Sequence, residues 1–318
     1  MPKPLALVTG VTGFIAGHVA LQLLEDGYRV RGLTSVKIPG LEFIEVDDIA
    51  AADLSAALKG VDVVMHVAAP LPGRTSVEGT LSSALEGTLN IVRQAEKLGI
   101  RKMVITATFG NVVNHWGKTS REEILEQANP FYTYFAAKNL AERALWDFAK
   151  SHPSVDIATI LPGFVHGPYA KGLPPPAGVP DLGSNLLVYE LINGKYPAVL
   201  PPWIVDVRDI ALAHVRALSL PPSAPANIGA KRFLVNGGNL VWRETAAAVL
   251  RTRGGEAGLN IAPLAGFEDL PGPASFLDTT RALKILGIKF RDPLQSMLEA
   301  VDDLLVLQRK WTAAPTRN

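Results

Sequence analysis

The chain has 318 residues, a length that fits one large domain or two joined domains. Its 31 Lys and Arg residues balance 30 Asp and Glu residues, and the formal net charge of +1 gives no reason to expect a nucleic acid as a partner. The chain contains no cysteine, which excludes disulfide bonds, thiolate catalysis and cysteine-based metal sites.

Segment 4–24 contains no Asp, Glu, Lys or Arg, and it is long enough for a membrane span or a signal peptide. Polar and glycine residues interrupt it at Thr9, Gly10, Thr12 and Gly13, and no small-residue cleavage site follows. We therefore expect no membrane association and a cytoplasmic protein.

The first half of the chain alternates short apolar runs with helical patterns. The predicted strands cover 5–8, 28–33, 61–67, 102–106 and 156–161. The predicted helices cover 18–26, 54–58, 79–98 and 134–150. Because a helix separates each strand from the next, the pattern predicts an α/β fold with a doubly wound parallel sheet of the Rossmann type.

After Pro162 the composition changes. Residues 162–202 include a dense Pro/Gly stretch at 172–178, which predicts an irregular wall or lid. Regular structure returns as a helix, a strand and two further helices, predicted at 207–218, 232–236, 242–251 and 296–311.

These elements predict two domains. Residues 1–165 form the dinucleotide-binding domain, and 203–220 and 231–238 return to it. Residues 166–202 and 221–318 form mainly a smaller, substrate-binding lobe over the carboxyl edge of the sheet.

The first predicted strand runs directly into a glycine-rich turn and then a helix. A pyrophosphate there would meet free backbone N–H groups and the positive end of the helix dipole. Glycine suits the tight turn at Gly10 and the close approach of backbone to phosphate at Gly13. The cofactor-binding candidates in this turn are Gly10, Thr12, Gly13, Phe14 and Ile15. The alternative is a tight turn that binds no ligand.

The end of the second predicted strand bears on the choice of dinucleotide. An acidic residue there would bind the ribose hydroxyls of NAD, but every charged residue of segment 27–41 is basic. Ser35 and Lys37 could bind a 2′-phosphate, so NADPH is favoured over NAD. Alternatively, Lys37, Arg29 and Arg31 are solvated strand charges. Farther along the chain, Asp48 and Ile49 are candidates for contacts to the adenine.

Tyr134 and Lys138 are four residues apart in a strongly helical segment, so both project from one face. A phenol has a pKa near ~10, and lowering it towards ~7 requires about 4 kcal/mol of preferential stabilisation of the tyrosinate. A neighbouring ammonium and the positive nicotinamide could supply it. The preceding strand ends at Thr108, whose hydroxyl could bind a substrate carbonyl. Alternatively, the Tyr and Lys spacing is a chance feature of a helix.

Several stretches together carry a family resemblance: 8–16, 61–70, 86–90, 134–142, 161–168 and 206–211. On these, the chain resembles the extended short-chain dehydrogenase/reductases. Within them it is similar to the group of dihydroflavonol reductases, cinnamoyl-CoA reductases and fungal methylglyoxal or ketone reductases. The resemblance covers essentially the whole chain.

The resemblance implies catalytic roles for three residues. Tyr134 is the proton donor, Lys138 binds the nicotinamide ribose and lowers the phenol pKa, and Thr108 stands where the family usually has serine. Cofactor contacts are implied at Val67, Ala68, Pro162 and Val165. Two features depart from the family: Ala16 occupies the third glycine position, and the second strand lacks the arginine that many NADP-using relatives carry.

We therefore expect NADPH-dependent reduction of a ketone or aldehyde, with a small-molecule carbonyl substrate and a monomer or homodimer. The alternatives are a sensor that binds the cofactor without turnover, and a sugar-nucleotide epimerase or dehydratase. The six histidines form no H-E-x-x-H pattern, so we expect no metal site. His66 and His166 are interpreted as packing or hydrogen-bonding residues. The candidates for lining a substrate pocket are Phe109, Asn114, Trp116, Tyr169 and Trp203.

Overall fold

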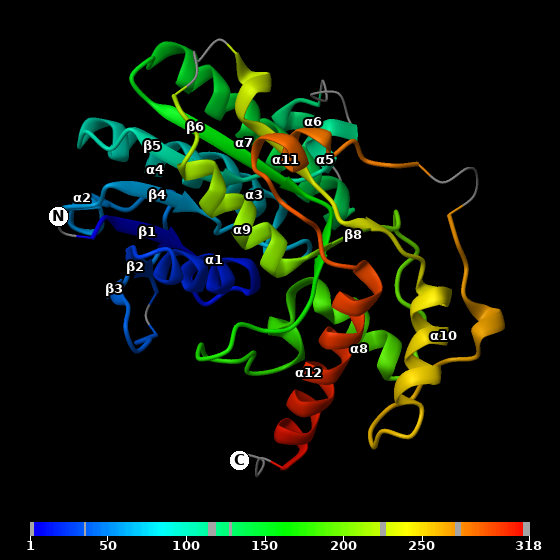
Figure 1. The fold of residues 1–318 in the computed structure, drawn as a ribbon. Coiled ribbons are helices and arrows are strands. Elements are labelled where there is room, and N and C mark those ends of the chain that lie inside the picture. The colour runs from blue at the N-terminus through cyan, green and yellow to red at the C-terminus, as the bar shows by residue number, and fades with distance from the viewer. Residues whose placement is uncertain are drawn as a thin grey trace.

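The computed structural model describes residues 3–34, 36–113, 119–126, 129–222, 227–270 and 275–313. Its main sheet has seven parallel strands in the order β3-β2-β1-β4-β5-β6-β9 (Figure 1). Their bounds are β1 Leu5–Thr9, β2 Arg29–Leu33, β3 Glu42–Ile44, β4 Val63–His66, β5 Lys102–Thr106, β6 Asp156–Pro162 and β9 Arg232–Val235. This confirms the predicted doubly wound parallel sheet.

Helices cover both faces of this sheet. On one face, apolar side chains of α1, α9 and α11 pack together with strand residues such as Val8 and Ile160. On the other face, α2, α4 and α7 pack against strand residues such as Leu7 and Ile105. The bounds are α1 Phe14–Glu25, α2 Ser55–Leu58, α4 Gly87–Lys97, α7 Pro130–Ser151, α9 Val207–Leu218 and α11 Thr280–Ile285. Apolar side chains therefore cover the sheet on both faces, as is usual for a parallel sheet.

The strand order places a switch point between β1 and β4. From β1 the chain winds outward through β2 and β3, and it then returns to β4 and winds the other way. In such sheets, the crevice outside the carboxyl ends of the strands at the switch point is the usual ligand site. The turn after β1 and the loop after β4 meet there.

The helix predicted at 79–98 is not one continuous α-helix. It consists of α3 (Val77–Leu81), a π-helical turn (Ser82–Glu86) and α4. The short helices α5 (Gly110–Val113) and α6 (Arg121–Leu125) follow β5 and were not predicted. The Pro/Gly stretch 172–178 carries no helix or strand, in agreement with the prediction of irregular structure there.

A second sheet contains β10 (Gly238–Asn239), β8 (Trp203–Asp206) and β7 (Phe164–His166), with β8 in the middle. Sequence reasoning missed this sheet because its strands are only two to four residues long and lie beside Pro/Gly-rich loops. Helices α8 (Leu186–Ile192), α10 (Trp242–Arg253) and α12 (Pro293–Ala313) pack beside it around a separate apolar cluster (Figure 1). The remaining short turns are 3-10 helices at Val179–Asp181, Gly183–Asn185, Ile228–Lys231 and Leu264–Gly266.

The C-terminal half contributes to both sheets. Strand β9 joins the main sheet and α9 packs against α1, whereas β8 belongs to the small sheet. The division into a dinucleotide-binding domain and a substrate lobe stays a prediction. Within the described ranges, no helix combines the length and apolar character needed to cross a bilayer.

Candidate active site

The glycine turn after β1 has the backbone geometry that glycine permits. Gly10 has a φ of +67°, and a Cβ there would lie 3.1 Å from the Cα of Ala68. The amide of Gly13 donates to the carbonyl of Gly10 at 2.7 Å, which closes the turn. Val11 packs over Gly32 of β2, where a Cβ would collide with it at 2.4 Å. Gly10 and Gly32 thus let the turn lie flat across the ends of β1, β2 and β4.

A buried hydrogen-bond chain fixes the loop after β4 beside this turn. The hydroxyl of Thr9 accepts from the amides of Val67 and Ala68, each at 3.0 Å, and therefore donates to Nδ1 of His66. Nε2 of His66 then carries its proton and donates to Thr88 at 3.2 Å. Burial lowers the pKa of His66 to about 3, so the ring is neutral. His66 is a hydrogen-bonding residue, as interpreted from the sequence.

Helix α1 begins at the turn without a capping side chain, because its N-cap residue is Gly13. The first amides of α1 therefore have no partner within the helix and suit an anion. They face a groove of about 580 Å³, which we call the turn groove. Thr12, Gly13 and Phe14 line it, together with Arg74 from the loop after β4.

Arg74 was missed by sequence reasoning. It lies eight positions past the end of β4 and is exposed, so its guanidinium is available to a phosphate. The signal that could have found it is its place after the carboxyl end of a strand at the switch point, where ligands bind.

The charges of β2 are already paired. Arg31 donates to Glu42 of β3 at 2.8 Å and to the carbonyls of Ala57 and Lys59, and Arg29 forms an ion pair with the same carboxylate. These bonds lower the pKa of Glu42, with Arg31 as the largest cause. Of the two arginines, Arg29 is a solvated strand charge, with 53% of its side chain exposed, whereas Arg31, with 14%, is not.

Three other predicted cofactor contacts on this side, Lys37, Asp48 and Ile49, are not among the described residues that line the turn groove. Lys37 is exposed, and Ser35 lies outside the described residues. Asp48 is exposed and accepts from the amide of Ala50, while Ile49 is partly buried and its carbonyl is held by Asn90.

A second cavity, of about 230 Å³, lies at the carboxyl ends of β5 and β6; we call it the tyrosine cavity. Its lining brings together five of the predicted site residues, namely Ile15, Thr108, Tyr134, Pro162 and Val165. Leu71 and Arg74 line both this cavity and the turn groove, so the two are contiguous. A dinucleotide could therefore extend from the start of α1 to the hydroxyls of Thr108 and Tyr134.

The predicted catalytic hydroxyls approach from two elements. Thr108 is buried just after β5, and its oxygen accepts from the amide of Gly110 at 3.3 Å, which leaves its O–H proton available to a substrate. Tyr134 is partly buried in the second turn of α7. Asn129 is the N-cap of this helix, and its side chain accepts from two amides of the first turn.

Lys138 is buried one turn after Tyr134. Its ammonium donates to the carbonyl of Thr106 at 2.7 Å. Burial lowers its pKa to about 8, although the Glu142 carboxylate one turn farther along acts to raise it. Lys138 is not among the described residues that line the tyrosine cavity, so its predicted contact with a nicotinamide ribose stays a prediction.

Glu142 ties α7 to the sheet. Its two carboxylate oxygens accept from Thr159 of β6 at 2.9 Å, from Arg232 of β9 at 2.9 and 3.0 Å, and from Asn111 at 2.7 Å. Since Asn111 follows Thr108 in the chain, this buried carboxylate holds both the helix of Tyr134 and the loop of Thr108.

The resemblance implies that Lys138 lowers the phenol pKa, and this role stays a prediction. Burial raises the pKa of Tyr134 to about 12, and desolvation is its cause. The ammonium of Lys138 is bonded to the Thr106 carbonyl. A phenol with this pKa keeps its proton at neutral pH and can still give it to a more basic oxygen, such as an alkoxide.

Of the predicted pocket residues, Phe109 lines the tyrosine cavity and Tyr169 lines the turn groove. Trp203 lines a further cavity beside Phe164. Asn114 and Trp116 lie outside the described residues. The predicted cofactor residues that do not line the turn groove or the tyrosine cavity, among those described, are Gly10, Lys37, Asp48, Ile49, Val67, Ala68 and Lys138.

Comparison with known proteins shows the family of the chain. A family model, the NAD dependent epimerase/dehydratase family, matches residues 6–229. The chain belongs to this family. An uncharacterized oxidoreductase of Schizosaccharomyces pombe is 37% identical over 253 residues, 69% of this chain and 74% of its own. Ketoreductase azaE of Aspergillus niger is 29% identical over 342 residues, 94% of this chain and 97% of its own.

The fold also matches that of solved reductase structures. The crystal structure of yeast methylglyoxal/isovaleraldehyde reductase Gre2 complexed with NADPH has a TM-score of 0.77 at 21% identity, covering 96% of this chain and 99% of its own. The family match and the oxidoreductase and ketoreductase relatives show that this chain is an NAD(P)-dependent oxidoreductase, and the resemblance inferred from the sequence is confirmed.

We predict that Gly10→Ala weakens dinucleotide binding. A side chain at a φ of +67° costs about 1–2 kcal/mol, and the new Cβ also pushes against the backbone of Ala68. The dissociation constant for NADPH, measured by calorimetry, should rise by about tenfold or more. Gly27→Ala is the matched control, because Gly27 has a φ of +88° with open space around it. An unchanged dissociation constant in Gly10→Ala would contradict the role of the turn.

Proposed function

We propose that this protein reduces a ketone or aldehyde to an alcohol with NADPH. The observation that carries the proposal is the lining of the tyrosine cavity, where the hydroxyls of Thr108 and Tyr134 lie with Ile15 from the first turn of α1. A dinucleotide anchored at the uncapped start of α1 reaches such a cavity through the contiguous turn groove. The names of the oxidoreductase and ketoreductase relatives support the same reaction class.

Each residue has a distinct task in this reaction. NADPH, when bound, supplies the hydride that becomes the new C–H bond of the alcohol. Thr108 donates a hydrogen bond that orients the substrate oxygen, and Tyr134 gives its proton to that oxygen as negative charge develops. Solvent then restores the phenol proton. Lys138 holds a positive charge next to the Thr106 carbonyl at the end of β5, within one helical turn of the phenol.

Local charge supports NADPH over NADH. Segment 33–41 contains no acidic residue, and Lys37 within it is exposed. The nearest acid along the chain, Glu42, is engaged by Arg29 and Arg31. A 2′-phosphate at the end of β2 therefore meets a cation and no unpaired carboxylate from this segment.

We predict that Tyr134→Phe lowers kcat by at least about 100-fold, because a general acid contributes roughly that much. The NADPH dissociation constant should change less than threefold, since the ring is retained. Steady-state reduction of a ketone panel and cofactor titration measure the two effects. Tyr132→Phe on the same helix is the control, because Tyr132 is exposed and lies outside the cavity lining. Parental turnover in Tyr134→Phe would eliminate the mechanism, and cofactor binding without any turnover in the parent would indicate a sensor.

We predict that kcat/KM for NADPH falls as pH rises through about 8. Lys138 has a lowered pKa of about 8 and so loses its positive charge above that pH, whereas Tyr134 stays protonated until about 12. Lys138→Arg keeps the charge at all these pH values, and the decline near pH 8 should disappear from its profile. If kcat/KM of the wild-type enzyme does not change up to pH 10, the charge of Lys138 does not contribute to the reaction.

We predict that Lys37→Glu raises KM for NADPH by about tenfold and leaves KM for NADH nearly unchanged, because a carboxylate repels the 2′-phosphate. Steady-state kinetics with both cofactors test this. Lys59→Glu is the control, because Lys59 precedes β4 and so lies at the opposite, amino edge of the sheet. An equal change in KM for NADPH and NADH would show that Lys37 does not contact the 2′-phosphate.

A further inference from the structure

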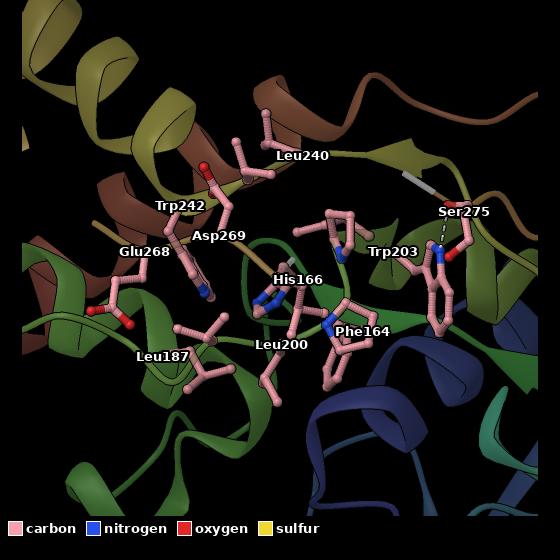
Figure 2. A pocket seen from close by; sticks show the side chains of 16 residues that line it. Phe164, His166, Leu187, Leu200, Trp203, Leu240, Trp242, Glu268, Asp269 and Ser275 are labelled. Carbon is pink, nitrogen blue, oxygen red and sulfur yellow. Dashed lines mark hydrogen bonds between the residues drawn. The ribbon is translucent and has the colours of Figure 1, made fainter. Parts of the chain in front are cut away.

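A cavity of about 430 Å³, which we call the distal cavity, lies between the small sheet and the loop around residues 267–270. Its walls are mainly apolar and aromatic, with Leu187, Leu200, Trp203 and Trp242 among them. Figure 2 shows the imidazole of His166 near the centre, with Trp242 on one side and Phe164 on the other. The rings of His166 and Trp242 are 6.0 Å apart in an edge-on arrangement.

The distal cavity continues the tyrosine cavity. Phe164 and Leu187 line both. Phe109, in the tyrosine cavity, packs against Phe164 at 5.1 Å and against Trp203 at 5.2 Å, so one aromatic wall runs from one cavity to the other. A substrate whose carbonyl lies at Tyr134 can therefore place a distant ring in the distal cavity.

His166 has one buried polar atom, Nε2, that could contact such a ring. The side-chain amide nitrogen of Asn185 donates to the carbonyl of Gly167 at 2.8 Å. The other polar atom of that side chain, 3.4 Å from Nδ1 of His166, is therefore the amide oxygen, which accepts. The proton of His166 therefore resides on Nδ1, and Nε2 presents a lone pair. Nε2 is buried and has no hydrogen-bond partner among the residues that the structure describes.

Burial keeps this ring neutral. It lowers the pKa of His166 to about 4, although the hydrogen bond to Asn185 acts to raise that pKa. At neutral pH, Nε2 is therefore a hydrogen-bond acceptor. A buried acceptor without a partner is costly, so a ligand that brings a hydrogen-bond donor to Nε2 is bound more tightly than one that does not.

The other polar groups restrict the ligand further. The indole N–H groups of Trp203 and Trp242 already donate to the carbonyls of Ser275 and Ala198. Glu268 and Asp269 are exposed at the lining, and the described lining residues include no Lys or Arg. The cavity therefore repels anions and suits an uncharged ring that carries a hydrogen-bond donor.

We propose that the distal cavity is a substrate subsite in which Nε2 of His166 accepts a hydrogen bond from a hydroxyl group of the substrate. The preferred substrates are then uncharged ring-bearing ketones or aldehydes with a hydroxyl on the ring remote from the carbonyl. This inference rests on the proposed carbonyl reduction and adds the substrate class to it.

The test compares matched ketones on the wild-type enzyme with NADPH. 4-(4-Hydroxyphenyl)-2-butanone is compared with its unsubstituted phenyl, 4-methoxyphenyl and 4-carboxyphenyl analogues, and with homologues lengthened by one or two methylene groups. In at least one chain length, the hydroxyl should raise kcat/KM about tenfold over the phenyl analogue. The methoxy group cannot donate and should give no gain, and the carboxylate should be the poorest substrate.

Two variants assign the effect to His166. His166→Phe removes the acceptor but keeps a ring, so the advantage of the hydroxyl should vanish while the phenyl ketone is still reduced. His166→Gln restores an acceptor oxygen and should recover part of the advantage. Because the substrate series is read on the wild-type enzyme, the proposal remains testable even if a variant fails to fold.

The outcomes separate the two proposals. If the wild-type enzyme reduces none of the ketones or aldehydes of a broad panel, the proposed function is overturned. If it reduces the series with equal kcat/KM for hydroxyl, methoxy and phenyl members at every chain length, carbonyl reduction stands and the subsite is overturned. A hydroxyl advantage that persists in His166→Phe also overturns the subsite.

Discussion

Two buried charges on successive turns of α7 hold the candidate active site together. The ammonium of Lys138 is bonded to a carbonyl at the end of β5, and the carboxylate of Glu142 accepts from residues of β6, β9 and α5. Burying a charge without partners costs several kcal/mol, so the helix has one rotation and one height that satisfy both groups. That position carries Tyr134, one turn earlier, over the carboxyl edge of the sheet beside Thr108.

The elements with local signals could be predicted from the sequence. The apolar runs of β1, β4 and β5 and the glycine turn are readable because each depends on neighbouring residues, and the same holds for the one-turn spacing of Tyr134 and Lys138. What the spacing could not show is the direction of the phenol pKa. Desolvation decides it, and desolvation depends on which segments cover α7 in three dimensions.

The parts that escaped prediction depend on long-range pairing. Strands β7, β8 and β10 are too short to show a period, and each forms only through a partner distant in the chain. The pairing of Arg29 and Arg31 with Glu42 likewise requires β3 to lie beside β2. The free lone pair of His166 is set by the orientation of one amide, at Asn185, which no residue pattern encodes.

The two ends of the site are therefore built differently. At the cofactor end, Thr9, His66 and Gly10 lie at strand ends and use their hydrogen bonds or backbone angles to fix one another, so a substitution there disturbs the sheet edge itself. The wall of the distal cavity includes residues of short strands, of loops and of the ends of α8 and α10, and some of them, such as Leu200 and Leu270, have apolar side chains that form no hydrogen bonds. Substitutions in that wall change the shape offered to the substrate and leave the sheet edge intact. Selectivity can thus vary within this family while the hydride-transfer geometry is kept.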